Sequence, residues 1–570
     1  MKPQIRVRRR ETGSSLGLVV ISLTILTTLG FGLLTVGYGA RRQAAVIKGE
    51  LAALLAAEAG YEKAVFWMTR QQDMLNALQQ GAPGTTGNLT FPDSSCTYQI
   101  SLFSFAGARP VFRIVSDGHG GPFERCVDVL VVQATSGWDM GTCRCPSGSG
   151  STTEVYFTSG ETIDMPVHIN KVDDHPDVRD IYISGTPDFQ QPVALGESRL
   201  TAGGSDKYTD VMNLFDAGVY FDQPASRVTD ESSVQTKINR FRNSTDAAYR
   251  FTPTGSAPVG NPQPAVQLEF FVDGGVGKVR ITNNCTVRGF RQSNDSQTYD
   301  FKIHPGSGGT QFDRYYIYTY HVASKNADTN GDRRTVTLTD TYVSQSFGDA
   351  ESEPGGQIFV DGNVVIGGNS TGHDGNQAIK GKVTVVATGN IWVADTLNAD
   401  GDHDASGMPT ANNPNALGLL AQGVIKVVDP GLSTIDGKVN LSQYKYAPIG
   451  KPDHPEVAES GNNYNERYLP DPMTVEAAIT VGGGGWGAEN VRRGSYGGRK
   501  EYSGSQDYLE VHGTIAEAIR GVVGVTGQDG FLKRYHMDRR LLTGIIPGDI
   551  SLRGKFVPAP AGWRDYRPGS

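Results

Sequence analysis

The fold is decided by GSSLGLVVISLTILTTLGFGLLTVGYGA, residues 13–40, a stretch without a charged side chain in a chain that is polar overall. At about 1.5 Å per helical residue, residues 16–40 are long enough to cross the ~30 Å hydrocarbon core of a bilayer. Five basic residues precede the stretch, and such basic flanks stay in the cytoplasm. We therefore expect a single-pass membrane helix, with the bulk of the chain outside the cytoplasm.

The apolar stretch differs from a cleaved secretory signal. Such a signal has an apolar region of about 7 to 15 residues and small residues at its cleavage site. This stretch is longer, and Tyr38 stands near its exit where a cleavage site needs a small residue. We expect the stretch to remain in the mature protein.

The helix is expected to continue beyond the membrane. From Ile47 to Met68, mostly apolar residues recur at steps of three and four, Ala and Leu are frequent, and GAPG at residues 81–84 ends the pattern. Residues 14–80 are thus predicted to form one long helix, the first part in lipid and the second part amphipathic.

Residues 8–80 resemble the N-terminus of type IV pilins and pseudopilins, most closely the minor pilins of the PilX type. The resemblance lies in the short basic leader, the glycine that ends it, the apolar stretch and AEAG at residues 57–60. It implies that a prepilin peptidase removes the leader, residues 1–13, by cutting after Gly13, which leaves Ser14 as the new N-terminus. The implied partners are this peptidase, other pilins or pseudopilins, and the bacterial cytoplasmic membrane.

One position departs from the family pattern. Major pilins carry a glutamate at the fifth residue of the mature chain, and the fifth residue counted from Ser14 is Leu18. In the family this carboxylate pairs with the amine of a neighbouring subunit, which matters in lipid because an unpaired charge there is costly. Tip pseudopilins share the absence, which implies a place at or near a filament tip. A membrane anchor that never polymerises is the alternative.

Residues 88–136 are predicted to form a small antiparallel sheet that packs on the helix as in a pilin head. Their β-rich runs are separated by Gly, Pro and Asp, which end strands. Cys96 and Cys126 fall in or beside different strands. A cross-strand disulfide is therefore expected outside the cytoplasm, with buried free thiols as the alternative.

The long remainder of the chain is rich in short Val and Ile runs closed by Gly, Asn or Asp. The clearest are GQIFVDGNVVIGG, residues 356–368, and GKVTVVATGNIWVAD, residues 381–395. Strands that turn a corner every few residues favour the rungs of a parallel β-helix or β-solenoid, with a sheet sandwich as the alternative. These runs also resemble a solenoid module of unknown biochemical role on PilX-like bacterial surface proteins. In it, GFLKRYHMDRRLL, residues 530–542, is interpreted as a cap that closes the solenoid's end.

The expected fold class is mainly β with a long N-terminal α-helix: a pilin-like helix and small antiparallel sheet, followed by a large parallel β-solenoid. The expected solenoid begins with rungs at residues 150–284, is interrupted by an insertion at 285–345, and continues with the main solenoid and cap at 346–570.

Two loops carry oxygen-bearing side chains at alternate positions, a spacing that suits a hard cation such as calcium. Neither has the glutamate of an EF-hand, and Asp and Asn also occur in loops simply because they make turns. The candidate ligands are Asn398, Asp400, Asp402 and Asp404 in the first loop, and Asn326, Asp328, Asn330 and Asp332 in the second.

The sequence favours a non-enzymatic minor pilin or tip pseudopilin that presents a solenoid at the cell surface for assembly, adhesion or binding of a surface glycan. The formal net charge of −8 argues against a surface that coats nucleic acid, although a DNA-binding competence pilin remains an alternative. A membrane-tethered polysaccharide-active enzyme is the other alternative, with Asp361, Asp395 and Asp400 as acids lining a groove. The basic, aromatic-interleaved residues that would bind DNA are Arg492, Arg493, Tyr496, Arg499 and Lys500.

Overall fold

The computed structural model describes the long N-terminal helix and most of the β-strands that follow it. The described residues are 14–71, 74–106, 109–134, 137–141, 155–170, 181–202, 210–223, 231–254, 262–288, 320–321, 333–337, 356–367, 376–427, 472–482, 484–488, 508–518, 520–521, 523–524, 531–543 and 555–568.

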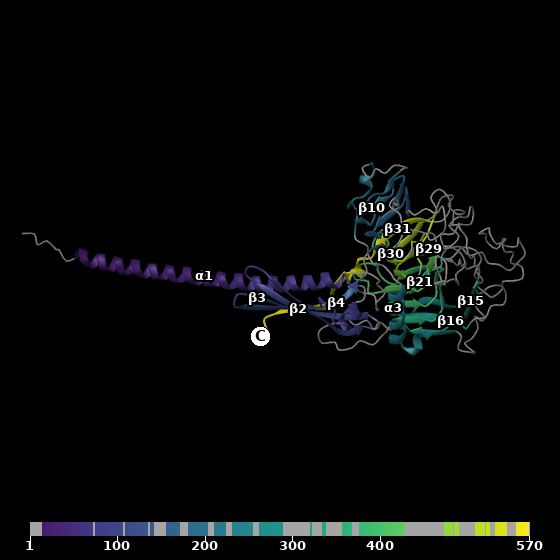
Figure 1. Ribbon diagram of the computed structural model, residues 1–570, viewed down its shortest axis with the longest axis horizontal. Coiled ribbons are helices and arrows are strands. Elements are labelled where there is room, and N and C mark those ends of the chain that lie inside the picture. Colours follow the sequence, from purple (N-terminus) through teal and green to yellow (C-terminus); the bar gives the residue numbers. More distant parts are fainter. Residues whose placement is uncertain are drawn as a thin grey trace, which may run out of the picture.

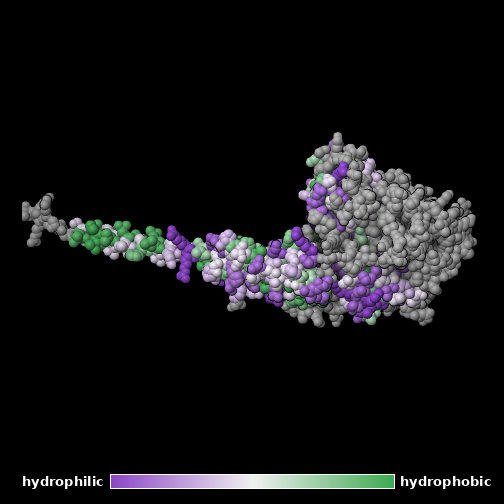
Figure 2. Space-filling model, in the orientation of Figure 1, coloured by the Kyte–Doolittle hydropathy of each residue, from purple (hydrophilic) through white to green (hydrophobic). Residues whose placement is uncertain are grey.

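A single long helix, α1 (Ser14–Met68), dominates the N-terminal part. Its 55 residues extend over roughly 83 Å, and its first half projects away from the rest of the molecule (Figure 1). This half carries the apolar surface in Figure 2, and large side chains such as Leu18 and Phe31 are about two-thirds exposed. The helix is long and apolar enough to span a membrane. It ends twelve residues before the predicted end at 80, because a turn at 69–71 separates it from α2 (Met74–Gln79).

The second half of α1 packs on a five-stranded antiparallel sheet, which we call the head sheet. Its strands lie in the order β1 (Thr86–Thr90), β2 (Ser95–Ala106), β3 (Arg109–Gly120), β4 (Phe123–Ala134) and β32 (Lys555–Tyr566). The predicted small sheet on the helix is therefore present. The assignment of residues 555–566 to the solenoid was wrong, because β32 pairs with β4 and completes the head sheet.

The rest of the described chain, the body, is built largely from parallel ladders. From residue 357 onward the chain visits three ladders in rotation. The first ladder holds β19 (Gln357–Val360), β22 (Lys382–Ala387), β25 (Ala416–Ala421), β28 (Ala478–Val481) and the end of β30 (Tyr508–Glu517). The second holds β20 (Asn363–Ile366), β23 (Ile391–Val393), β26 (Ile425–Val427) and β29 (Trp486–Ala488). The third holds β21 (Asn376–Ile379), β24 (Thr396–Ala399), β27 (Met473–Val475), the start of β30 and β31 (Leu532–Met537).

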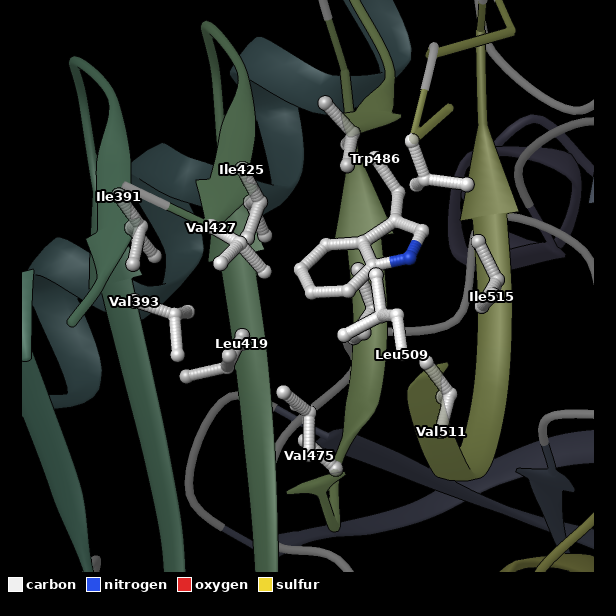
Figure 3. Close-up of a cluster of buried hydrophobic side chains, with 14 of the residues drawn as sticks. Ile391, Val393, Leu419, Ile425, Val427, Val475, Trp486, Leu509, Val511 and Ile515 are labelled. Atoms are coloured by element: carbon white, nitrogen blue, oxygen red, sulfur yellow. The ribbon is translucent and has the colours of Figure 1, made fainter. Parts of the chain in front are cut away.

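The inward side chains of these ladders form one apolar core. In Figure 3, Val393, Leu419, Val475 and Trp486 come from four different strands and point toward one another. Burial of such side chains contributes roughly 25 cal/mol for each Å² removed from water. Gly381, with φ of 103°, stands directly before β22 in a conformation that side-chain-bearing residues rarely adopt, as the turn chemistry of the sequence predicts.

The strands of the body do not stack in the order of the sequence. The chain enters the first ladder in its middle, at β5 (Trp138–Met140), and moves to one edge through β8 (Val167–Ile169), β11 (Val193–Leu195) and β13 (Val219–Tyr220). It then crosses to the opposite edge at β14 (Arg250–Phe251) and returns strand by strand to β30, which pairs with β5. We call residues 137–223 the first half of the body and residues 250–543 the second half.

Helix α3 (Glu231–Ser244) connects the two halves along the outside of the first ladder. Its apolar residues Val234, Ile238 and Phe241 are fully buried and cluster with Phe359 and Leu420 of the ladder. An amphipathic helix therefore covers an outer ladder face that is itself apolar.

The remaining strands complete the side walls. In the first half, β7 (Thr162–Asp164) and β10 (Asp188–Phe189) extend the third ladder beyond β31, while β6 (Val155–Thr158), β9 (Ile181–Ser184) and β12 (Thr201–Ala202) form a separate parallel sheet. In the second half, the antiparallel hairpin β15 (Pro262–Asp273) and β16 (Val276–Arg288), with β17 (Tyr320–His321) and β18 (Arg333–Thr337), extends the second ladder.

The interpretation of residues 530–542 as a terminal cap was wrong. Strand β31 lies between β30 and β7, and both neighbours pair with it in parallel. The last strand of the body in the sequence is therefore an inner strand of the third ladder. The ladder continues beyond it through β7 of the first half.

Candidate functional site

The N-terminal helix is the first candidate functional element. Gly13 lies outside the described residues, and Ser14 is the first residue of α1. Leu18, the fifth residue counted from Ser14, is 66% exposed. The exposed apolar half of α1 is suited to lipid or to the apolar helices of other subunits.

Glycines bring α1 unusually close to the head sheet. A Cβ atom on Gly118 of β3 would collide with the carbonyl oxygen of Ala53 and would lie 2.5 Å from the backbone nitrogen of Ala57. On the helix, a Cβ atom on Gly60 would collide with Ser116 and lie 2.9 Å from the sulfur of Cys96. Glycine within a strand marks a close approach of another backbone, so DGHGG at residues 117–121 was the signal that the sequence interpretation missed.

The opposite face of the same part of α1 is left exposed and apolar. Ile47, Leu51 and Leu55 recur at steps of four and are each more than half exposed. Residues four apart share one face of a helix, so the three side chains form a stripe, which we call the outer stripe. This stripe continues the apolar surface of the first half of α1 toward the head.

A buried carboxylate ties β32 into the head sheet. The side chain of Asp128 on β4 is fully buried and accepts hydrogen bonds from Nε of Arg113 at 2.8 Å and from Nε of Arg564 at 2.9 Å. Burial acts to raise the pKa of this carboxyl, but the two guanidinium groups prevail and lower it. The C-terminal strand is thereby held to the strand from which the body departs.

The expected disulfide between Cys96 and Cys126 was wrong. Both are free and buried. Cys96 pairs with Gly118 of β3, whereas Cys126 pairs with the adjacent Asp117. Neighbouring residues of a strand point to opposite faces, so the two thiols lie on opposite faces of the sheet with a strand between them.

The first candidate calcium loop is fully described. Asn398 donates a hydrogen bond to Asn376, and the carboxylate of Asp400 lies 3.3 Å from Nζ of Lys380. Asp404 accepts hydrogen bonds from the backbone and hydroxyl of Ser406, which lower its pKa. Among the described residues, no three His, Cys, Asp or Glu side chains form a group that could hold a metal ion. Calcium binding here, including a role for Asp402, stays a prediction.

A row of histidine and acidic side chains crosses the third ladder, and the sequence interpretation did not find it. Nε2 of His403 lies 3.0 Å from Oε1 of Glu476, and Nδ1 of His512 lies 3.6 Å from the same oxygen. The next strands add His536 and Asp164, 3.7 Å apart. Burial lowers the pKa of His536. These residues belong to five separate stretches, so only the ladder register brings them together.

The other sequence candidates fall outside the described residues or are engaged in contacts. The second calcium loop, with Asn326, Asp328, Asn330 and Asp332, and the basic stretch with Arg492, Arg493, Tyr496, Arg499 and Lys500 lie outside the described residues. Of the acids considered for an enzyme, Asp395 is fully buried and accepts a hydrogen bond from Gln377. Asp361 pairs with Arg242 at 3.0 Å.

Comparisons with known proteins add a similarity among solved structures. No protein-family model and no curated protein matches the chain. Among solved structures, the crystal structure of the competence-associated pilin ComZ from Thermus thermophilus is similar over 91% of this chain and 98% of that chain, with 12% identity and a TM-score of 0.29. A similarity at this TM-score does not establish a shared fold, so the function has to be inferred from the residues and their geometry.

Proposed function

We propose that the protein is a non-enzymatic, pilin-like subunit of a type IV filament or a related assembly. The observation that supports it is the construction of α1. One uninterrupted helix begins at Ser14, exposes its apolar first half, and packs its second half on an antiparallel sheet through Gly60 and Gly118. This layout serves both as a membrane anchor before assembly and as a helical stem within a filament.

We further propose that the body is a β-solenoid grafted onto this pilin-like head. The rotation of the chain through three parallel ladders and the shared apolar core support this interpretation. The body begins after β4 and ends before β32, two strands that pair with each other. It is therefore an insertion between β4 and β32 of the head sheet.

A position at or near the filament tip is the part of the proposal that rests on Leu18. Without a carboxylate at this position, α1 lacks the charge that would pair with the amine of a subunit ahead of it in lipid. A tip subunit needs no such pairing, and it has room for a large body. From there the solenoid would be presented to a surface glycan, to DNA or to another cell.

Filament membership is tested by a charge on the outer stripe. Leu51→Lys should reduce the amount of protein recovered with sheared filaments at least fivefold while its amount in the membrane stays unchanged. Lys63→Glu, at an exposed position of the same helix that lies off the stripe at 3.6 residues per turn, is the control for a change of charge and should behave as the unmodified chain. Equal recovery of the two variants would contradict the proposal that this helix face packs on other subunits.

A further inference from the structure

Trp563 on β32 differs from the other tryptophans of the chain in its exposure. It is 43% exposed, whereas the others are buried or partly buried, as tryptophan usually is in folded proteins. Its ring lies edge-on against the ring of Tyr61 on α1, with 5.0 Å between the two centroids. Trp563 therefore stands at the β32 edge of the head sheet, beside the helix and open to a partner.

The backbone that precedes Trp563 has an unusual conformation. The pairing of β32 with β4 is interrupted by a bulge between Pro558 and Trp563, and Ala561 within this bulge has a φ of 56°. Asp222 is the other described non-glycine residue with a positive φ. Bulges re-aim side chains, and strained backbone is retained where the surrounding structure requires it, often at binding sites. The placement of Trp563 is thus specified at a cost to the local backbone.

On α1, the residues that lead to this contact follow a heptad spacing. They recur at alternating steps of four and three, the spacing by which one helix packs against another in a coiled coil. We call them the heptad seam: Ile47, Leu51, Leu54, Glu58 and Tyr61. Tyr61 is buried against the head sheet, whereas Ile47 and Leu51 are more than half exposed. The head therefore covers the C-terminal end of the heptad seam and leaves its N-terminal end uncovered.

The height of Trp563 above the apolar half of α1 favours a protein partner over lipid. Tyr61 lies roughly 30 Å along the helix axis from Ala40, where the uncharged stretch ends. The headgroup layer of a bilayer is only about 5–8 Å deep, so Trp563 lies beyond it when α1 spans a membrane. Tryptophan is also among the residues that contribute most binding energy at protein interfaces.

We propose that Trp563 and the exposed end of the heptad seam form one docking surface, whose occupant is an apolar α-helix of another pilin-like subunit. The partner helix follows the heptad seam from Ile47 toward Glu58, where Trp563 packs against its side. A polar residue within such a seam specifies register, so Glu58 faces a basic or polar side chain of the partner helix. This inference rests on the proposed filament role and adds the C-terminal strand to the contact.

Photo-crosslinking on the full chain, in native membranes and filaments, tests the contact. Benzoylphenylalanine in place of Trp563 should crosslink to a helical peptide of another subunit, identified by mass spectrometry, at least fivefold more often than benzoylphenylalanine in place of Phe91. Phe91 is the matched control, because it is 39% exposed and follows β1 at the opposite edge of the head sheet. Equal yields at the two positions, or products of position 563 with lipid, glycan or non-helical segments only, would overturn the proposal.

A serine variant separates this inference from the filament role. Trp563→Ser should lower the recovery with sheared filaments at least threefold while hydrogen exchange in β3 and β4 stays slow, and Phe91→Ser should leave recovery unchanged. If Leu51→Lys lowers recovery and Trp563→Ser does not, the docking role of Trp563 is overturned and the filament role stands. If neither variant lowers recovery, the filament role fails with it. Fast exchange throughout the head of Trp563→Ser would show a structural role only and would also overturn the docking role.

Discussion

The close packing of α1 on the head sheet predicts that Gly118→Ala is strongly destabilising. The added methyl group would collide with the carbonyl oxygen of Ala53 and stand 2.5 Å from the nitrogen of Ala57. A carbon atom packs at about 3.5 Å from such backbone atoms, so the 2.5 Å contact alone requires α1 and β3 to separate by about 1 Å. Because both obstacles are backbone atoms of a helix, no side-chain rotation relieves the collision.

The cost follows from overpacking a well-packed core, about 1–3 kcal/mol, and we expect the upper end of that range. In a head of this size each kcal/mol lowers the melting temperature by roughly 4–8 °C, so a fall of roughly 10–20 °C is expected. The measurement is hydrogen exchange of β2 and β3 at rising temperature, on the full chain in detergent. Gly37→Ala, where an added Cβ has nothing within 4 Å, is the control and should not lower the transition. If the head of Gly118→Ala melts at the same temperature as that of Gly37→Ala, the close contact between α1 and β3 is refuted.

Three further predictions concern the head and the buried Glu517 of the body. Asp128→Asn should cost about 1–3 kcal/mol and make β32 the first segment released by trypsin; unchanged cleavage would show that the two arginines do not hold it. Burial raises the pKa of Glu517 from 4.5 to about 7, so its stabilising contribution is fully present below pH 4.5 and is lost as the pH rises through 7, about 3 kcal/mol in all; urea unfolding should show this loss, and Glu517→Gln should abolish it. Cys96 and Cys126 should both react with iodoacetamide after unfolding without a reductant, whereas a protected, linked pair would contradict the register of the head sheet.

The sequence predicted the elements whose signals are local. An uncharged apolar run with a basic flank suffices for α1, whose described residues run from Ser14 to Met68. Glycine before β22 marked a real strand boundary, because the backbone there has positive φ. The mainly β character of the remainder follows from the same kind of signal.

The features that the sequence did not predict depend on pairing between distant segments. A strand of three residues such as β5 carries no sequence signal that specifies β30 as its partner. The interrupted strand order could therefore not be predicted from the sequence. Prolines 558 and 560 argue against a strand, yet β32 forms at the edge of the head sheet, where proline is tolerated. The disulfide failed for a related reason, because a shift of one residue in register places a side chain on the other face.

The row of histidine and acidic side chains on the third ladder, which includes Glu476, His512 and His536, could not be predicted for the same reason. Each residue is unremarkable in its own stretch, and only the parallel register of β27, β30 and β31 aligns them. Composition and spacing therefore identify the architecture of this protein better than its chemistry.

Processing of this chain into a pilin-like subunit is measured by the intact mass of the protein recovered from its native membrane. The mass is compared in cells with and without active prepilin peptidase, together with Gly13→Leu and the neighbouring control Gly17→Leu. We expect a chain that begins at Ser14 only when the peptidase is active and residue 13 is glycine. A chain that keeps its basic leader in every case would contradict it.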